Sequence, residues 1–322
     1  MRRLSRAVTL MLALFLIIPL EAGAVQLLIP GGQLIGLELQ NDAVTVAAFD
    51  DTFGAAARDA GLQIGDQLLA VEGRPVTSAE DVRQALKTCG QKVNLEILRG
   101  SKRLEIAITP VDTRDGKRLG VYLRQGIAGV GTVTFYDPES DVFGTLGHGV
   151  NDNQGALLAM TTGKACPAAV ASVKKGKCGD PGQLRGNVDP EILFGTITKN
   201  TPQGVFGTSK RGITGEPLPI ASFADVKPGP ATIRSTVGSD GVREYSVEIL
   251  KIYPQDRSDC RNFLIRVTDP ALLKTTGGIV QGMSGSPIIQ NGKLVGAVTH
   301  VLVNDPTRGY GIFIENMLEA AD

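Results

Sequence analysis

The segment that most constrains the fold of this chain spans residues 277–300 and is built around a glycine-flanked serine. Its centre, Gly-Met-Ser-Gly-Ser-Pro at positions 282–287, surrounds Ser284 with small residues. Glycine permits backbone angles that other residues resist, so this turn can expose the Ser284 hydroxyl. Two apolar runs follow, separated by Asn291-Gly292, which is the strongest two-residue signal for a β-hairpin. The sequence therefore predicts an exposed serine mounted on a rigid hairpin.

The same turn can aim the backbone amides of Gly282 and Ser284 at one point. Such a pair stabilises the oxyanion that forms when a serine attacks a carbonyl. The segment resembles the nucleophile turn of trypsin-like serine proteases, in which Gly-x-Ser-Gly-x-Pro also precedes a hairpin. The alternative is a glycine-rich turn with an incidental serine, because short motifs are weak evidence alone. The proline and the hairpin in register favour the nucleophile.

Composition narrows the function classes. The chain has 322 residues with 40 glycines and 17 prolines, which suits turn-rich β structure in about two domains. The 33 basic and 33 acidic residues balance, so no charge excess points to nucleic acid or to an acidic substrate. No phosphate loop, dinucleotide fingerprint or metal-ligand cluster is recognisable, and we expect neither a cofactor nor a metal.

The first 24 residues have the layout of a signal peptide. Three arginines at positions 2, 3 and 6 precede an apolar run over 7–20, and Ala-Gly-Ala at 22–24 reads as a cleavage site. The run is shorter than a comfortable membrane span. We therefore expect export across the cytoplasmic membrane, with a retained membrane anchor as the alternative.

The four cysteines do not have metal-site spacing. In an exported protein Cys166 could pair with Cys178, but sequence does not fix connectivity. Four unpaired thiols are an equal alternative.

Residues 27–112 are expected to form a compact α+β module. A strand over 44–48, a turn at Gly65-Asp66, a helix capped at Thr77-Ser78 and reaching about Lys87, and a hairpin at Gly100-Ser101 follow one another. This order, with Ala-Gly-Leu at 60–62 before Gly65-Asp66, resembles a bacterial PDZ domain, which is a partly open barrel.

PDZ domains bind peptides by adding a strand to a sheet edge. The resemblance places the binding groove between a strand containing Leu34, Ile35, Gly36 and Leu37 and the helix over 78–87. The ligand is then a partner peptide or a segment of the chain itself. The alternative is a spacer whose groove is not used.

From residue 119 to 322 the chain reads as a second, mainly β domain. Short alternating runs are separated by clusters of Gly, Pro and Asp, as in a sandwich or barrel. Together with the serine turn, this predicts a trypsin-like double β-barrel after the PDZ domain.

A serine hydroxyl becomes a good nucleophile when a base accepts its proton, and histidine is the usual base near neutral pH. The chain has two histidines. His148 lies between glycines on a turn after an apolar strand, and we predict that it is the base. His300 ends a strand after the hairpin, where trypsin-like enzymes align the substrate backbone, and it is a candidate for specificity.

A third group should orient the imidazole and stabilise its cation. Asp269 follows a predicted strand and lies fifteen residues before Ser284. Trypsin-like enzymes place this aspartate much nearer the histidine, so Asp141 and Asp152 are rivals. Residue chemistry alone does not choose among the three.

The whole arrangement resembles the stage IV sporulation protein B family, the S55 serine peptidases. The shared features are the N-terminal apolar segment, the PDZ module, Gly147-His148, Val-Thr-Asp at 267–269, the serine turn, and Gly-Ala-Val-Thr-His-Val at 296–301. The resemblance implies that His148, Asp269 and Ser284 are base, orienting acid and nucleophile.

The resemblance also implies a role. Family members are secreted from the forespore into the space between its two membranes. There they cleave a membrane-bound sporulation regulator and so trigger the processing of a sigma factor. The PDZ domain is implied in self-recognition, self-cleavage and substrate targeting. The competing hypothesis is a non-catalytic PDZ scaffold whose protease-like domain only binds.

Overall fold

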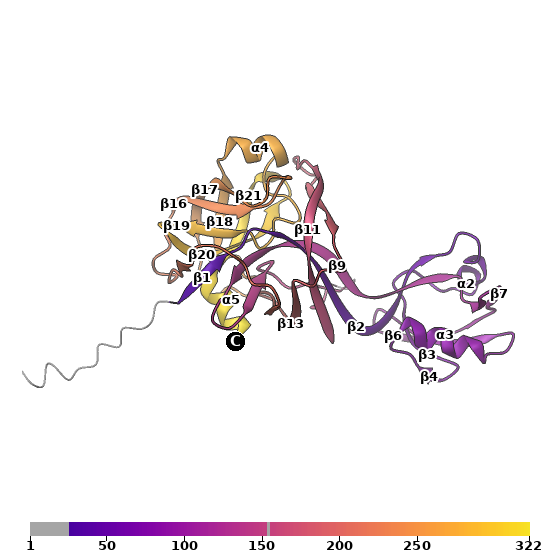
Figure 1. Ribbon diagram of the computed structural model, residues 1–322. Helices are drawn as coiled ribbons and strands as arrows, with labels where there is room; N and C mark the ends of the chain where they lie inside the picture. The colour runs from indigo at the N-terminus through magenta and orange to yellow at the C-terminus, as the bar shows by residue number, and fades with distance from the viewer. Residues whose placement is uncertain (1–25, 153–154) are drawn as a thin grey trace, which may run out of the picture.

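Two strands of 16 residues, β2 (Leu34–Phe49) and β9 (Val121–Tyr136), each belong to two parts of the molecule. The computed structural model describes residues 26–152 and 155–322. Figure 1 shows β2 and β9 running from the main body of the protein to a smaller domain that stands apart. The predicted signal peptide at residues 1–24 lies outside the described residues.

The first barrel is a closed ring of six strands. Its ring order is β9, β10, β14, β13, β11 and β2, and pairing of Leu34–Leu39 on β2 with residues 132–127 on β9 closes it. The remaining strands are β10 (Val142–Thr145), β11 (Thr162–Lys174), β13 (Gly195–Thr201) and β14 (Gly204–Ser209).

The second barrel is also closed and has six strands. Its members are β16 (Gly229–Ser235), β17 (Arg243–Ile252), β18 (Phe263–Val267), β19 (Pro287–Gln290), β20 (Lys293–Leu302) and β21 (Asp305–Phe313). The Asn291-Gly292 hairpin joins β19 to β20, and both residues have positive φ (52° and 73°), as a two-residue turn of this kind requires. The expected double β-barrel is confirmed.

The smaller domain is the PDZ domain. Besides parts of β2 and β9, it contains α2 (Ala55–Asp59), β3 (Gln67–Val71), β4 (Arg74–Pro75), α3 (Ala79–Lys87), β5 (Val93–Arg99), β6 (Lys102–Ile108), β7 (Val111–Thr113) and β8 (Gly116–Arg118). Its apolar core is a separate cluster of buried side chains from these elements. As predicted, Ser78 caps α3, because its hydroxyl accepts a hydrogen bond from the amide of Asp81 (3.0 Å).

The boundaries expected from sequence need correction. Residues 27–112 do not form one domain before the peptidase, because β1 (Leu27–Pro30) and the first half of β2 pair within the first barrel. The PDZ domain is instead inserted between residues 44 and 125. The sequence hides this because residues 34–39 and 44–49 belong to one strand, and a bulge between Leu39 and Val44 separates its two parts.

Four shorter elements complete the chain: β12 (Gln183–Val188), β15 (Leu218–Pro219), α4 (Pro270–Thr276) and α5 (Ile314–Ala321). Ile314 and Met317 of α5 are buried against Phe135 of the first barrel and Ala297 of the second, so α5 helps to hold the barrels together. All four cysteines are free thiols, and the possible pair of Cys166 with Cys178 is absent.

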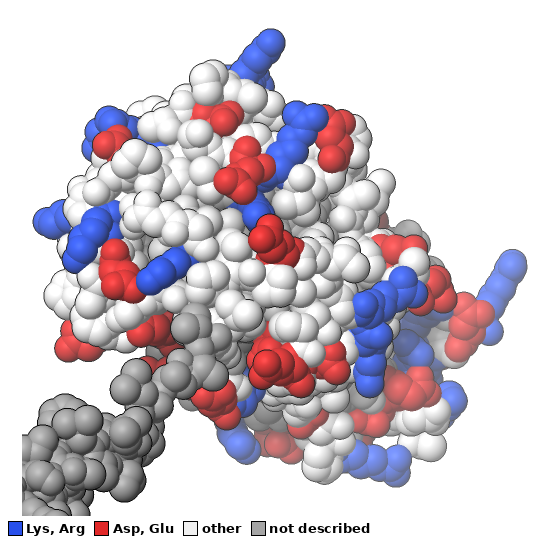
Figure 2. All heavy atoms as spheres, turned by 60° about the vertical axis from the view of Figure 1, so that its left-hand side comes forward, with Lys and Arg blue, Asp and Glu red and all other residues white. Residues whose placement is uncertain are grey.

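Charged side chains of both signs are interspersed on the face shown in Figure 2, and neither sign forms a continuous field there. Within residues 26–152 and 155–322, no helix combines the length and the apolar character needed to cross a membrane.

Candidate active site

The turn that carries Ser284 lies between α4 and β19 and depends on two glycines with positive φ, Gly282 (97°) and Gly285 (95°). A Cβ atom at Gly285 would lie 2.0 Å from the carbonyl oxygen of Thr132, so no larger residue fits there. Close packing against the first barrel, as well as backbone angle, therefore explains the glycine after the serine.

Strand β9 of the first barrel anchors this turn of the second barrel through two buried threonines. The Thr132 amide donates to the Ser284 carbonyl (2.9 Å), and its hydroxyl donates to the Gly282 carbonyl (2.8 Å). The Thr134 hydroxyl donates to the Gly285 carbonyl (2.8 Å). Because both threonines have 0% exposure, solvent cannot replace these bonds.

The same anchoring leaves two amides of the turn available. The amides of Met283 and Gly285 donate to the carbonyls of Val280 and Val298 (3.1 and 2.7 Å). By contrast, the amides of Gly282 and Ser284 donate no hydrogen bond to any described residue. These are the two donors predicted to form an oxyanion hole, and their hydrogens are free for a ligand.

His148 follows β10 and the left-handed Gly147. Its Nδ1 lies 2.9 Å from the carbonyl oxygen of Gly149, so Nδ1 carries the proton and Nε2 remains an acceptor. Burial lowers the pKa of the imidazole below its usual value, and the bond to Gly149 opposes this shift only in part. His148 is therefore neutral at pH 7, as a general base must be.

Ser284, His148 and Gly282 line one cavity of about 330 Å³ between the barrels. The Ser284 hydroxyl donates to the carbonyl of Thr299 (2.8 Å) in this conformation. The structure therefore brings the predicted nucleophile and base into one cavity, with the hydroxyl turned towards β20.

His300 on β20 lies directly beside His148, with 5.1 Å between the ring centroids. Burial, followed by the charges of His148 and Arg261, lowers the pKa of His300 to about 4. Its Nδ1 is buried and has no hydrogen-bond partner among the described residues. Sequence reasoning missed this contact between the two histidines; the specificity role of His300 stays a prediction.

Asp269 does not make the contact expected with His148. Its Oδ1 accepts hydrogen bonds from the amides of Ala271 and Leu272 (2.9 Å each) at the start of α4, and its Oδ2 accepts from Ser246 (3.4 Å). The Asp-Pro pair at 269–270 is a typical helix start, with an N-cap acceptor and proline at the first helical position. This helix-start signal is present in the sequence, and it accounts for an aspartate at position 269 without a catalytic role.

The rival acids are engaged elsewhere too. Asp141 accepts a hydrogen bond from the Tyr136 hydroxyl (2.5 Å), and Asp152 accepts one from the Ala156 amide (3.0 Å). Among the described residues, the hydrogen-bond partner of the His148 ring is the Gly149 carbonyl. A backbone oxygen therefore holds the position that we expected a carboxylate to take.

The groove expected at Leu34, Ile35, Gly36 and Leu37 is also corrected. All four residues pair with β9 on one edge, and Ile35, Gly36 and Leu37 also pair with β11 on the other, so this part of β2 is an interior strand of the barrel. Within the described residues, the PDZ sheet has two open edges: β6, which pairs only with β5, and residues 121–125 of β9, which pair only with β2. Helix α3 begins beside the 121–125 edge, where Gln125 donates to the Thr77 carbonyl (2.6 Å).

Removing one anchor of the turn should impair catalysis while leaving the fold intact. Thr132→Val keeps the shape but leaves the buried Gly282 carbonyl unsatisfied, which costs ~1–3 kcal/mol of folding free energy. Because a small misplacement of a catalytic group can cost about 100-fold in rate, we expect kcat to fall by roughly that factor. Peptide hydrolysis and thermal unfolding would measure the two effects.

The matched control is Thr232→Val, since the Thr232 hydroxyl is buried without a partner among the described residues. Thr232→Val should leave both kcat and the thermal unfolding temperature close to those of wild type. Equal kcat values for Thr132→Val and Thr232→Val would contradict the anchoring role.

Activity should persist in mildly acidic solution. The base must be neutral, and burial lowers the pKa of His148 from its ordinary value of 6.5, so protonation and loss of kcat/KM should occur only as pH falls below 6.5. A pH profile of kcat/KM on a neutral peptide measures this. An acid limb with its midpoint at or above 6.5 would disagree with the burial of His148.

Comparison with known families gives two matches along the chain. The model of the SpoIVB peptidase S55 family matches residues 115–318, and a PDZ domain model matches residues 52–99.

Two curated proteases share part of the sequence. A probable periplasmic serine endoprotease DegP-like of Pseudomonas fluorescens is 32% identical over 142 residues, covering 40% of this chain and 29% of that protein. Serine protease HTRA1 of Xenopus tropicalis is 37% identical over 73 residues, covering 23% of this chain and 15% of that protein. The matched part therefore spans less than a third of either relative.

Among solved structures, the active form of the Rv3671c protease of M. tuberculosis aligns with a TM-score of 0.39 at 16% identity. The alignment covers 61% of this chain and 74% of that one.

Proposed function

This chain belongs to the SpoIVB peptidase S55 family, and on that premise we propose that it is a serine endopeptidase whose nucleophile is Ser284. The observation that carries the proposal is the single cavity in which Ser284 and a neutral His148 meet the unpaired amides of Gly282 and Ser284. Nucleophile, base and oxyanion donors are the three parts that acyl transfer needs.

The proposed reaction begins when a bound peptide draws the Ser284 hydroxyl away from Thr299. His148 Nε2 accepts its proton as the oxygen attacks the carbonyl carbon, and the resulting oxyanion is bound by the amides of Gly282 and Ser284. His148 then protonates the leaving amine, and water releases the acyl group by the same steps in reverse order. The Gly149 carbonyl holds Nδ1–H throughout and so keeps the required tautomer.

Four substitutions test this assignment. Ser284→Ala and His148→Ala should each lose fluorophosphonate labelling and lower proteolysis by several orders of magnitude. Ser286→Ala should keep labelling, because the Ser286 hydroxyl is buried and bonded to that of Ser235 (3.1 Å). His300→Ala should retain partial activity. Labelling of wild type and Ser284→Ala to the same extent would favour the non-catalytic scaffold instead.

Asp269→Asn separates the two roles considered for Asp269. As a helix cap, asparagine replaces aspartate with little loss, so activity should stay near that of wild type. A loss of kcat approaching that of Ser284→Ala would restore Asp269 as the orienting acid.

We further propose that the physiological substrate is a membrane-bound sporulation regulator, cut in the space between the two forespore membranes. The family supports this role, and residues 1–24 supply the expected export signal or membrane anchor. The open 121–125 edge of β9 offers a place for strand addition by a partner peptide or by a segment of another copy, which suits substrate targeting and self-cleavage.

The cellular test replaces the chromosomal copy with Ser284→Ala. Sigma-factor processing, followed by immunoblot during sporulation, should stop, and Ser286→Ala should leave it unchanged. Normal processing in the Ser284→Ala strain would refute the sporulation role and leave the peptidase assignment intact.

A further inference from the structure

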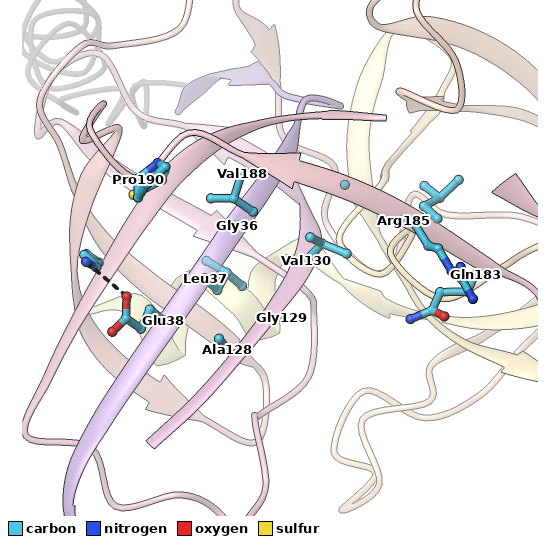
Figure 3. Close-up of a pocket in the computed structure, with 14 residues that line it drawn as sticks. Gly36, Leu37, Glu38, Ala128, Gly129, Val130, Gln183, Arg185, Val188 and Pro190 are labelled. Carbon is cyan, nitrogen blue, oxygen red and sulfur yellow. Dashed lines mark ion pairs between the residues drawn. The ribbon is translucent and has the colours of Figure 1, made fainter. Parts of the chain in front are cut away.

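A second cavity has a volume of about 460 Å³, and Figure 3 shows the residues that line it. It lies between β12 and the sheet formed by β2, β9 and β11. Leu37, Gly129 and Val130 line both cavities. The two cavities are therefore neighbours along β9.

The outer wall of this cavity is fixed to the catalytic turn. Strand β12 pairs with β11, and the amide of Leu184 donates to the carbonyl of Gln281 (2.8 Å), the residue before Gly282. Leu184 is fully buried, and a Cβ at Gly282 would lie 3.1 Å from its side chain. Strand β12 is therefore held directly against the turn that carries Ser284.

The chemistry of the lining is mainly apolar. The apolar side chains are Leu37, Ala128, Val130, Leu184, Val188 and Pro190. Lys164 and Glu38 neutralise each other in an ion pair of 3.0 Å, drawn as a dashed line in Figure 3. Arg185 is exposed on β12 and forms no ion pair with a described residue. The cavity therefore suits an aliphatic side chain, with one unneutralised cation beside it.

The direction of the substrate follows from proton transfer. His148 must protonate the leaving amine, so the chain segment after the cleaved bond departs past His148 through the first cavity. Residues 299–302 of β20 line neither cavity. This strand is therefore assigned to the part of the substrate that precedes the cleaved bond.

We propose that the second cavity is the subsite for the residues that follow the cleaved bond. It selects peptides with an aliphatic residue there and an acidic residue beside Arg185. This inference rests on the proposed peptidase function and names its substrate class.

Gly129 offers a direct test, because a Cβ atom there would meet nothing within 4 Å. Gly129→Val should therefore fold normally and place methyl groups in the space shared by both cavities. The matched control is Gly238→Val, at a glycine between β16 and β17 that is equally open. Substrates are quenched peptides that differ only after the cleaved bond, with Leu or Ala in the apolar position, and mass spectrometry locates each cut.

Wild type and Gly238→Val should prefer the Leu peptide by about tenfold in kcat/KM, as for other hydrophobic subsites, and Gly129→Val should lose this preference. Fluorophosphonate labelling should persist in wild type and in Gly238→Val, since the probe needs Ser284 and His148 and Gly238 lies outside both cavities. Equal cleavage of Leu and Ala peptides by wild type, or an unchanged preference in Gly129→Val, would overturn the subsite. Loss of labelling in wild type would instead count against the peptidase itself.

Arg185→Glu provides a second readout at an exposed position. In peptides with Asp or Lys at the adjacent position, wild type should favour Asp by about fivefold, as expected for an exposed ion pair, and the variant should favour Lys. If the preference for Asp survives Arg185→Glu, Arg185 does not read the substrate and the acidic requirement is wrong.

Discussion

The active site depends on the contact between Thr132 of one barrel and the serine turn of the other. Three hydrogen bonds from two fully buried threonines fix the backbone on both sides of Ser284. The turn also has a local hydrogen bond, from the Ser286 amide to the Met283 carbonyl (3.0 Å), but its glycines with positive φ give the backbone little intrinsic preference for one conformation. The strand that restrains the turn also enters the PDZ domain, so the anchor of Ser284 and the open 121–125 edge of the PDZ sheet lie on one strand.

Much of this fold could be read from local patterns. The Asn291-Gly292 hairpin, the Ser78 cap and the small residues around Ser284 are features that one short segment determines, and each appears where it was expected. The insertion of the PDZ domain could not be read in this way. It follows from pairings such as Leu34 with Thr132, which join residues far apart in the sequence.

Asp269 shows how a motif can have two physical meanings. An aspartate after a strand and before a proline suits both an orienting acid and a helix cap, and sequence alone gives no distance to the histidine. In the structure, the carboxylate is surrounded by the amides that begin α4, while a carbonyl beside His148 holds the ring. The proximity of His148 to His300 likewise depends on how the two barrels meet, which no local pattern records.

In topological terms, β2 and β9 form one long hairpin, and the PDZ domain takes the place of its turn. Leu39 already pairs with Ile127 at the foot of that hairpin, so the first barrel is complete without the intervening segment. If the chain were cut anywhere between residues 44 and 125, the two fragments would remain joined by the strand pairing of the barrel. A cut within the PDZ domain would therefore leave both barrels and the serine turn assembled in one molecule.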